Sequence, residues 1–267
     1  MQVIRYGNHP SQYGSLSLPS TPGPWPVVVI VHGGFWRTAY GAELGEPLAA
    51  ELVQHGFAAW NLEYRRVGDD SKAGGGGWPT TCLDVAAGVD ALAGPGQEAA
   101  GGRLDLSRVV ALGHSAGGHL VGWLAGRGVR GAAAPGGSPL VPITGFVSQA
   151  GVLDLELAMA DNLGAGAAQA FLGDRAGDAA EVALASPVVS VPTSVPSVCV
   201  HGTADDVVPI NQSESYLAAA TAAGDRCRLV PVSGADHSAP IDVSSAAWAA
   251  CLAAALELTA LGGDPKV

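Results

Sequence analysis

The sequence predicts an α/β protein of three layers, with helices on both faces of a mostly parallel sheet. Short apolar runs rich in Val and Ile alternate with longer helix-like stretches, which is the pattern of chained βαβ units. The runs are apolar at nearly every position, as is typical of parallel strands that are buried on both faces. The helix-like stretches are long enough for right-handed crossovers between such strands.

Each expected strand ends at glycine, proline or polar residues, and each expected helix lies after one of these strands. In chain order, the expected strands are residues 27–31, 57–61, 108–112, 143–148, 198–200 and 228–232. The expected helices are residues 43–55, 80–93, 116–125, 212–223 and 244–261.

Three segments interrupt this alternation. Residues 68–77, which include four consecutive glycines, and the Gly-, Ala- and Pro-rich residues 126–142 are expected to be surface loops. Residues 155–185 contain helical pieces without a clear strand, and we expect them to form a minimal lid beside the sheet. Because neither an internal repeat nor an interdomain linker is visible, residues 1–267 are expected to form a single domain.

The composition narrows the classes of partner. The 267 residues are 48% hydrophobic and 14% charged, which provides for a large core. A formal net charge of −11, with 13 Lys and Arg residues, argues against nucleic acid and acidic membranes as partners. The N-terminal residues do not have the pattern of a secretory signal, so we expect a cytoplasmic protein. The longest apolar run, residues 246–256, is too short to span a bilayer.

The cysteines are widely spaced and form no C-x-x-C pair, so the sequence indicates neither a zinc site nor a redox motif. They are Cys82, Cys199, Cys227 and Cys251, and we expect buried free thiols. No metal and no cofactor are expected, and the partner is a small-molecule substrate. The alanine-rich C-terminal helix would also allow close packing of a second copy in a homo-oligomer.

Residues 113–117 read G-H-S-A-G and lie between the expected strand 108–112 and the expected helix 116–125. This strand–turn–helix context is typical of a nucleophile elbow, in which a sharp turn presents a serine above the sheet. Glycines flank the serine because bulkier neighbours would clash in such a turn. We interpret Ser115 as a nucleophile, and the alternative is a structural serine in a glycine-rich turn.

Residues 32–36 read H-G-G-F-W and follow the first expected strand, as the H-G-G motif of esterases does. Glycine lets the main chain approach a tetrahedral intermediate closely. The backbone N–H groups of Gly34, Phe35 and Ala116 are therefore the candidate donors of an oxyanion hole. We expect His32 to shape this loop through hydrogen bonds, without a chemical role.

A serine needs an imidazole to remove its proton, and the imidazole needs a carboxylate to orient it. Asp205 and His237 each follow an expected strand, and the carboxyl ends of parallel strands meet at one edge of a sheet. The order Ser115, Asp205, His237 is the one expected for a hydrolase of this architecture.

Other residues compete for the two roles that support the serine. Asp206 is adjacent to Asp205, and Asp154 follows the expected strand 143–148. We prefer Asp205 on its loop position. Four further histidines lie outside the strand-end loops or flank the nucleophile without the geometry of a base; they are His9, His55, His114 and His119.

Five motifs in this order make nearly the whole chain resemble the α/β-hydrolase superfamily. They are residues 32–36, 63–65, 113–120, 201–209 and 236–237. More narrowly, the sequence resembles small esterases and kynurenine formamidases (arylformamidases) that carry H-G-G-x-W and G-H-S-A-G, and it is similar to bacterial feruloyl-esterase-like proteins. In the pattern H-G-x-x-D-x-x-V-P of that family the acid is the fifth residue, which is Asp205 here. Phe35 departs from the tyrosine that formamidases commonly carry at its position.

The expected activity is hydrolysis of small carboxylic esters, with short-acyl or aryl groups, through an acyl-enzyme. One alternative is an arylformamidase that acts on N-formylkynurenine-like substrates. Another is a ligand-binding protein without catalysis on the same fold. Trp36 and Trp78 are candidates for the walls of a substrate pocket, with Trp78 on a mobile glycine-rich flap, although both residues could equally pack in the core. Arg65 and Asp84 are expected to form a structural ion pair.

Overall fold

One eight-stranded sheet organises the protein, and the computed structural model describes residues 1–262. The strands are β1 (Gln2–Arg5), β2 (Tyr13–Ser17), β3 (Trp25–Val31), β4 (Ala58–Leu62), β5 (Leu104–His114), β6 (Gly145–Gln149), β7 (Ser197–Gly202) and β8 (Cys227–Val232). Their order in the sheet is β1-β2-β4-β3-β5-β6-β7-β8. The strands from β4 to β8 in this order pair in parallel, whereas β2 is antiparallel to both of its neighbours.

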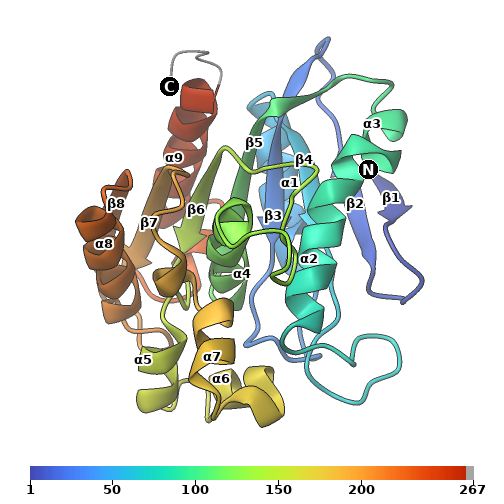
Figure 1. The fold of residues 1–267 in the computed structure, drawn as a ribbon. Coiled ribbons are helices and arrows are strands. Elements are labelled where there is room, and N and C mark those ends of the chain that lie inside the picture. The colour runs from blue at the N-terminus through green and yellow to red at the C-terminus, as the bar shows by residue number, and fades with distance from the viewer. Residues whose placement is uncertain (263–267) are drawn as a thin grey trace.

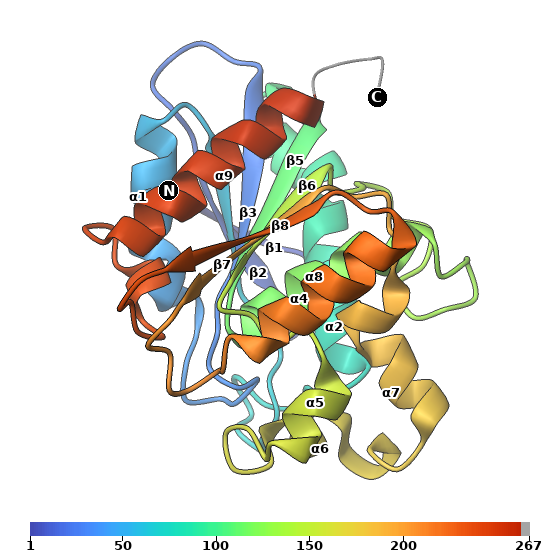
Figure 2. The same cartoon turned by 90° about the vertical axis from the view of Figure 1, so that its left-hand side faces the viewer.

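Helices cover both faces of the sheet, so the predicted three-layer α/β class is confirmed. The helices are α1 (Glu46–Gln54), α2 (Thr80–Asp90), α3 (Pro95–Ala99), α4 (Ala116–Ala125), α5 (Leu155–Ala160), α6 (Ala167–Leu172), α7 (Ala179–Ala185), α8 (Asn211–Ala223) and α9 (Ala246–Gly262). Figures 1 and 2 show α1 and α9 on one face and α2, α4 and α8 on the other.

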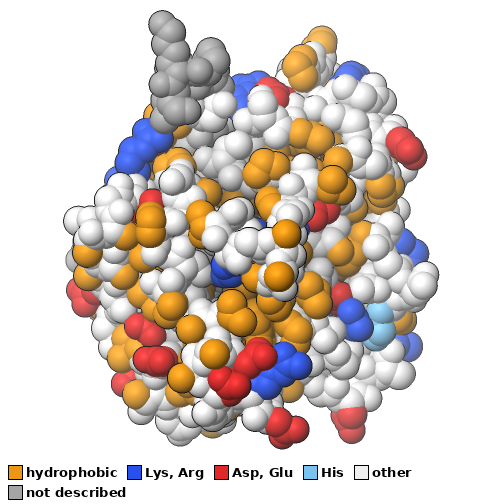
Figure 3. Space-filling view, in the orientation of Figure 1, with side chains coloured by type: hydrophobic (Ala, Val, Ile, Leu, Met, Phe, Trp, Pro, Cys, Tyr) orange, Lys and Arg blue, Asp and Glu red, His pale blue; other side chains and the backbone are white. Residues whose placement is uncertain are grey.

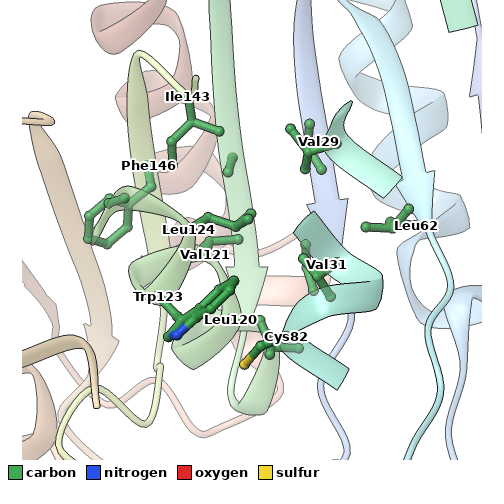
Figure 4. Packing of buried hydrophobic residues seen from close by; sticks show 14 of the residues in the cluster. Val29, Val31, Leu62, Cys82, Leu120, Val121, Trp123, Leu124, Ile143 and Phe146 are labelled. Atoms are coloured by element: carbon green, nitrogen blue, oxygen red, sulfur yellow. The ribbon is translucent and has the colours of Figure 1, made fainter. Parts of the chain in front are cut away.

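The two faces of the sheet explain why the central strands are apolar at nearly every position. On β3, Val29 and Val31 face the layer of α2 and α4, whereas Val28 and Ile30 face α1 and α9. Figure 4 shows the first of these layers, where Leu120 of α4 lies close to the sheet. Full burial of such a side chain stabilises the fold by roughly 1.5–3 kcal/mol. A polar residue would therefore be costly at any of these positions.

All six predicted strands are present, but β1 and β2 were not predicted. They form the antiparallel edge of the sheet, and in β1 only Ile4 is buried. An edge strand with one buried side chain does not leave a periodic apolar pattern in the sequence. The short helix α3 also escaped prediction, because it spans a Gly- and Pro-containing turn.

The segment that was expected to form a lid contains α5, α6 and α7. These helices lie below the sheet in Figure 1, at the end toward which the arrowheads of β3, β5 and β6 point. The carboxyl ends of the parallel strands, where α/β proteins place their sites, therefore face this segment. None of the helices within residues 1–262 is both long and apolar enough to cross a membrane.

Charged side chains brace the loops around the sheet. The guanidinium of Arg65 donates to both carboxylate oxygens of buried Asp84, with Nε–Oδ2 and Nη2–Oδ1 distances of 2.8 and 2.7 Å. This pair has the structural role expected for it, because it ties the chain after β4 to α2.

On the face in Figure 3, Lys and Arg side chains are few and scattered. Cys82, Cys199 and Cys251 are buried thiols, whereas Cys227 is half-buried.

Candidate active site

Ser115 occupies a sharp turn between β5 and α4. Its backbone has φ 55° and ψ −118°, in the left-handed region that costs a non-glycine residue about 1–3 kcal/mol. The flanking glycines are required by close contacts. A Cβ at Gly113 would lie 2.2 Å from the carbonyl oxygen of Gly117, and a Cβ at Gly117 would lie 2.0 Å from that of Val31. This strand, strained turn and helix form a nucleophile elbow.

Asp205 and His237 follow β7 and β8 and meet through a short hydrogen bond. His237 Nδ1 lies 2.7 Å from Asp205 Oδ2. The other carboxylate oxygen accepts the N–H groups of Val207 and Val208, at 3.0 and 2.9 Å. His201 Nε2 also lies 3.4 Å from Asp205 Oδ2. The carboxylate is therefore fixed on both of its oxygens.

The surroundings of Asp205 keep it ionised. Burial raises the pKa of the carboxyl group, but hydrogen bonds from His201, His237 and the Val208 amide outweigh burial and hold the pKa well below its usual range. A carboxylate has no proton to donate, so His237 Nδ1 must carry the proton of their hydrogen bond. In the neutral ring, His237 Nε2 is then free to accept a proton.

Neither of the two alternative acids, Asp206 and Asp154, contacts His237. Asp206 is exposed to solvent. Asp154 caps the first turn of α5 by accepting the Leu157 N–H at 3.1 Å, and it accepts the Ser215 hydroxyl at 2.7 Å. Of the three candidate acids, Asp205 is the one whose carboxylate contacts His237.

Ser115 and His237 line the same cavity, which has a volume of about 290 Å³. The elements that meet there are the turn after β5, the loop after β8, and loops after β3 and β7. Apolar side chains form much of the wall, together with polar and glycine residues. The lining residues are Gly34, Phe35, Tyr40, Leu44, His114, Ser115, Val207, His237, Ser238 and Ile241.

The loop after β3 has an unusual backbone. Gly34, Phe35 and Trp36 have φ angles of 108°, 52° and 56°, so three successive residues are left-handed. Within residues 1–262, the N–H groups of Gly34 and Phe35 have no hydrogen-bond acceptor. Ala116 is the first residue of α4, where N–H groups lack partners within the helix. These three amides can donate to a negatively charged oxygen.

A buried polar cluster holds this loop from behind. His32 Nε2 donates to Glu63 Oε1 at 3.1 Å, and the His32 ring stacks on Tyr64 with a centroid distance of 4.4 Å. The Tyr64 hydroxyl donates to the His32 carbonyl oxygen at 2.7 Å. Burial raises the pKa of Glu63, but hydrogen bonds from His32 and Arg66 lower it to about 2. His32 thus shapes the loop through hydrogen bonds, as its sequence position indicated.

The chain matches a known family over most of its length. The family model BD-FAE matches residues 16–219, which is more than half of the chain. The chain belongs to the BD-FAE family. This family consists of esterases of the α/β-hydrolase type. The predicted resemblance to that superfamily and to feruloyl-esterase-like proteins is therefore confirmed.

Solved structures show the same fold over almost the full chain. A truncated carbohydrate esterase from gut microbiota has a TM-score of 0.78 at 22% identity, over 97% of this chain and 96% of its own. A thermophilic esterase from Thermogutta terrifontis, with butyrate bound, has a TM-score of 0.74 at 23% identity, over 100% and 96%. A bifunctional GH43-CE protein of Bacteroides eggerthii has a TM-score of 0.77 at 25% identity, over 96% and 35%. A search of curated proteins finds no match.

Trp36 and Trp78 are not among the residues that line the pocket of this BD-FAE protein, so of the two roles open to them they have the one in the core. Trp36 is 1% exposed, stacks on Phe171 at 4.6 Å, and donates its Nε1–H to His119 Nδ1 at 3.3 Å. Trp78 is 7% exposed and donates to Glu181 Oε2 at 2.6 Å. Both indoles pack in the core beside the lid helices, because a large aromatic side chain gains most from burial.

The residues that do line the pocket of this BD-FAE protein come from loops close to the motifs. Tyr40 and Leu44 follow the H-G-G loop, Val207 follows Asp205, and Ile241 follows His237. Sequence reasoning missed them because loop residues have no periodic pattern. Their only signal was their short distance along the chain from a motif.

Other parts of the described structure do not resemble this site. Residues 1–262 contain no group of three or more His, Cys, Asp or Glu side chains placed to hold a metal ion. A larger cavity, of about 430 Å³, lies where β7 and β8 begin, and its lining includes Cys227, Arg228 and Glu257. That cavity lies at the amino ends of the parallel strands, whereas Ser115 lies at their carboxyl ends.

Proposed function

We propose that this protein is a serine hydrolase that cleaves small carboxylic esters, with short-acyl or aryl groups, through Ser115, His237 and Asp205. The observation that carries the proposal is the convergence on one cavity of a serine in a nucleophile elbow and a histidine bonded to an ionised carboxylate. A serine hydroxyl is a poor nucleophile alone, and a neutral imidazole beside it supplies the base that it needs.

The reaction is acyl transfer in two halves. Ser115 Oγ attacks the ester carbonyl while His237 Nε2 takes the hydroxyl proton, and Asp205 stabilises the imidazolium that forms. The tetrahedral intermediate collapses, the C–O bond to the alcohol breaks, and His237 gives its proton to the departing alcohol. Water then attacks the acyl-enzyme with His237 again as base, which releases the carboxylic acid and restores Ser115.

The amides of Gly34, Phe35 and Ala116 are the donors in the proposed oxyanion hole. Gly34 and Phe35 have N–H groups that no acceptor within residues 1–262 occupies, and Ala116 lies at the N-terminus of α4, where the helix dipole favours negative charge. Donors that are fixed before the reaction stabilise the developing oxyanion without reorganisation. The cluster behind the loop, with Glu63 at its centre, supplies that rigidity.

The size and the walls of the cavity support a small substrate with an apolar part. A volume of about 290 Å³ accommodates a short acyl chain or one aromatic ring. Phe35, Tyr40 and Val207 offer apolar contacts to either group. Two of the similar structures support an ester substrate, since one is described as a carbohydrate esterase and another holds butyrate.

An arylformamidase would use the same residues, so substrate comparison has to separate the two activities. We would measure kcat/KM for p-nitrophenyl acetate, butyrate and a long-chain ester, and for N-formylkynurenine. We expect the short esters to be fastest. A large advantage for N-formylkynurenine over every ester would assign the formamidase activity instead, and absence of turnover on all four would favour a ligand-binding protein.

The nucleophile is tested by a fluorophosphonate, which labels an activated serine covalently. We expect the wild-type protein to be labelled at Ser115 and Ser115→Ala to be unlabelled, with turnover lower by at least about 10⁴-fold. Ser238→Ala is the control, because Ser238 lines the same cavity and should not be the labelled residue. Labelling that persists in Ser115→Ala would refute the assignment.

A further inference from the structure

Two side chains at neighbouring strand ends reach the backbone of the loop that carries His237. His114 ends β5 and Gln149 ends β6, and the two are directly paired in the register of these parallel strands. His114 Nε2 donates to the His237 carbonyl oxygen at 2.8 Å. Gln149 Nε2 donates to the Pro240 carbonyl oxygen at 2.6 Å. The loop is thus attached to the sheet at two points, three residues apart.

The His114 ring also lies between the two halves of the site. Its centroid is 4.6 Å from that of the His237 ring, and the two planes are inclined by 44°. On its other side, a Cβ at Gly33 would come 2.9 Å from His114 Nδ1. The ring therefore lies close both to His237 and to Gly33 of the loop after β3.

His114 is suited to donate to this carbonyl and unsuited to act as a base. Burial first, and then the proximity of His237, lower the pKa of His114 to about 4. The ring is therefore neutral near pH 7 and carries one N–H group, which must be at Nε2 because that nitrogen faces a carbonyl oxygen. A neutral ring also avoids repulsion of the imidazolium that forms on His237.

We propose that His114 and Gln149 are positioning residues, which hold the His237 loop so that the imidazole stays between Asp205 and Ser115. The inference rests on the proposed function, since it concerns the same base. The Asp205 bond fixes one nitrogen of the ring, whereas the two strand-end side chains fix the backbone from which the ring projects. Small displacements of reacting groups are costly in rate, so this support affects catalysis directly.

The test removes each hydrogen bond with little change in shape. His114→Phe keeps a ring but has no donor, His114→Gln keeps an N–H donor of similar reach, and Gln149→Leu removes the second donor. We expect His114→Phe to lower kcat by about 10–100-fold, with KM changed by less than about 3-fold, because both acylation and deacylation use His237. His114→Gln should recover most of the wild-type kcat.

Stability is separated from positioning by a matched control. Trp123→Phe also keeps a ring and loses one buried N–H donor, which bonds to the Leu184 carbonyl oxygen at 3.1 Å outside the site. We expect this variant to have a lower Tm and a wild-type kcat at temperatures well below its Tm.

The double variant of His114→Phe and Gln149→Leu should show a smaller loss of kcat than the product of the two single losses, since both side chains act on one loop.

The outcomes distinguish this inference from the proposed function. Wild-type kcat in His114→Phe, or an equal loss in His114→Gln, would overturn the positioning role even though the wild-type enzyme cleaves esters. If the wild-type protein neither turns over esters nor reacts with a fluorophosphonate at Ser115, the proposed function fails and this inference fails with it. If His114→Phe does not fold, Gln149→Leu and His114→Asn, whose amide is too short to reach the carbonyl, decide the question by the same measurements.

Discussion

At the scale of single residues, the proposed site depends on the carboxylate of Asp205, which accepts hydrogen bonds with both of its oxygens. Asp205 accepts the Nδ1–H of His237 with one oxygen and two backbone N–H groups with the other. Its neighbour Asp206 is exposed, and Asp154 is engaged in capping α5. The three carboxylates are therefore not interchangeable, although all three follow strands of one sheet.

We expect Asp205→Asn to lower kcat by about 10⁴-fold, because an amide in place of the carboxylate favours the wrong tautomer of His237. Asp206→Asn should change kcat by less than about 3-fold, since its side chain is in solvent. Steady-state kinetics on a short-chain ester measure both. A larger loss in Asp206→Asn or Asp154→Asn than in Asp205→Asn would show that another residue is the acid.

The pH dependence follows from the two groups of this pair. The pKa of Asp205 is held well below its usual range, so Asp205 is ionised at neutral pH and contributes no step there. The histidine must be neutral to accept a proton, so we expect kcat/KM to rise with pH and then to reach a plateau. A flat profile from about pH 5 to 8 would exclude His237 as the base.

Ser115, Asp205 and His237 were predictable from the sequence because each follows an apolar run that is recognisable as a strand. Sequence reasoning could not decide between pocket and core for Trp36 and Trp78, because the direction of a side chain in a loop depends on contacts far along the chain. Trp36 meets Phe171 and His119, which no local pattern connects to it. Residue types near a motif were therefore predictable, whereas their orientation was not.

At the scale of elements, the segment that contains α5, α6 and α7 packs against the proposed oxyanion loop. Gly164 lies in the turn between α5 and α6 with φ 55°, and a Cβ there would come 2.6 Å from the Phe35 ring. Arg37 Nη2 donates to the Gly164 carbonyl oxygen at 2.5 Å. A change in this turn is therefore transmitted to Phe35, whose N–H is a proposed oxyanion donor.

We expect Gly164→Ala to lower kcat/KM by about 10-fold or more, because the added methyl group displaces the Phe35 ring and strains the turn. The matched control is Gly177→Ala in the same segment, where an added Cβ would meet no atom within 4 Å. Ester kinetics and thermal unfolding of both variants measure the effect. Equal kcat/KM in the two variants would contradict this coupling between the lid and the loop.

The central elements were predictable, and the peripheral ones were not. The strands β3, β4, β6 and β7 and the C-terminal half of β5 are buried because both faces of the sheet are covered there, which leaves a strong signal in the sequence. By contrast, β1 buries only Ile4, and the backbone of β1 is placed by its antiparallel pairing with β2. Pairing partners at a sheet edge depend on the whole topology, which local patterns do not encode.

At the scale of the whole molecule, buried titratable groups make stability depend on pH. Burial lowers the pKa of His114 to about 4 and that of His119 to about 3. Both values are below the ordinary value of about 6.5 in an unfolded chain. As the pH falls below about 6.5, the unfolded state therefore binds protons that the folded state does not, and stability is lost toward about pH 3. Glu63, whose pKa is about 2, adds a further loss below about pH 5.

We expect the free energy of unfolding to fall steadily from pH 7 to pH 4. The fall is about 1.4 kcal/mol for each pH unit over which one such group is protonated in the unfolded state but not in the folded state. His119→Gln removes one of these groups outside the active site, so its stability should depend less steeply on pH between about 6.5 and 4. Urea unfolding at a series of pH values measures both slopes. Parallel curves for the two proteins would show that His119 does not contribute.

The three proposed catalytic residues are far apart in the chain, and they follow β5, β7 and β8. Ser115 belongs to a local unit of strand, turn and helix, whereas Asp205 and His237 are brought to it by the pairing of β6, β7 and β8 beside β5. Contacts between residues that are distant in sequence form slowly, because the intervening chain must first be closed into a loop. During refolding, helical signal should therefore return before reactivity toward a fluorophosphonate does. The time at which a covalent probe begins to label Ser115 would then report when the C-terminal strands dock.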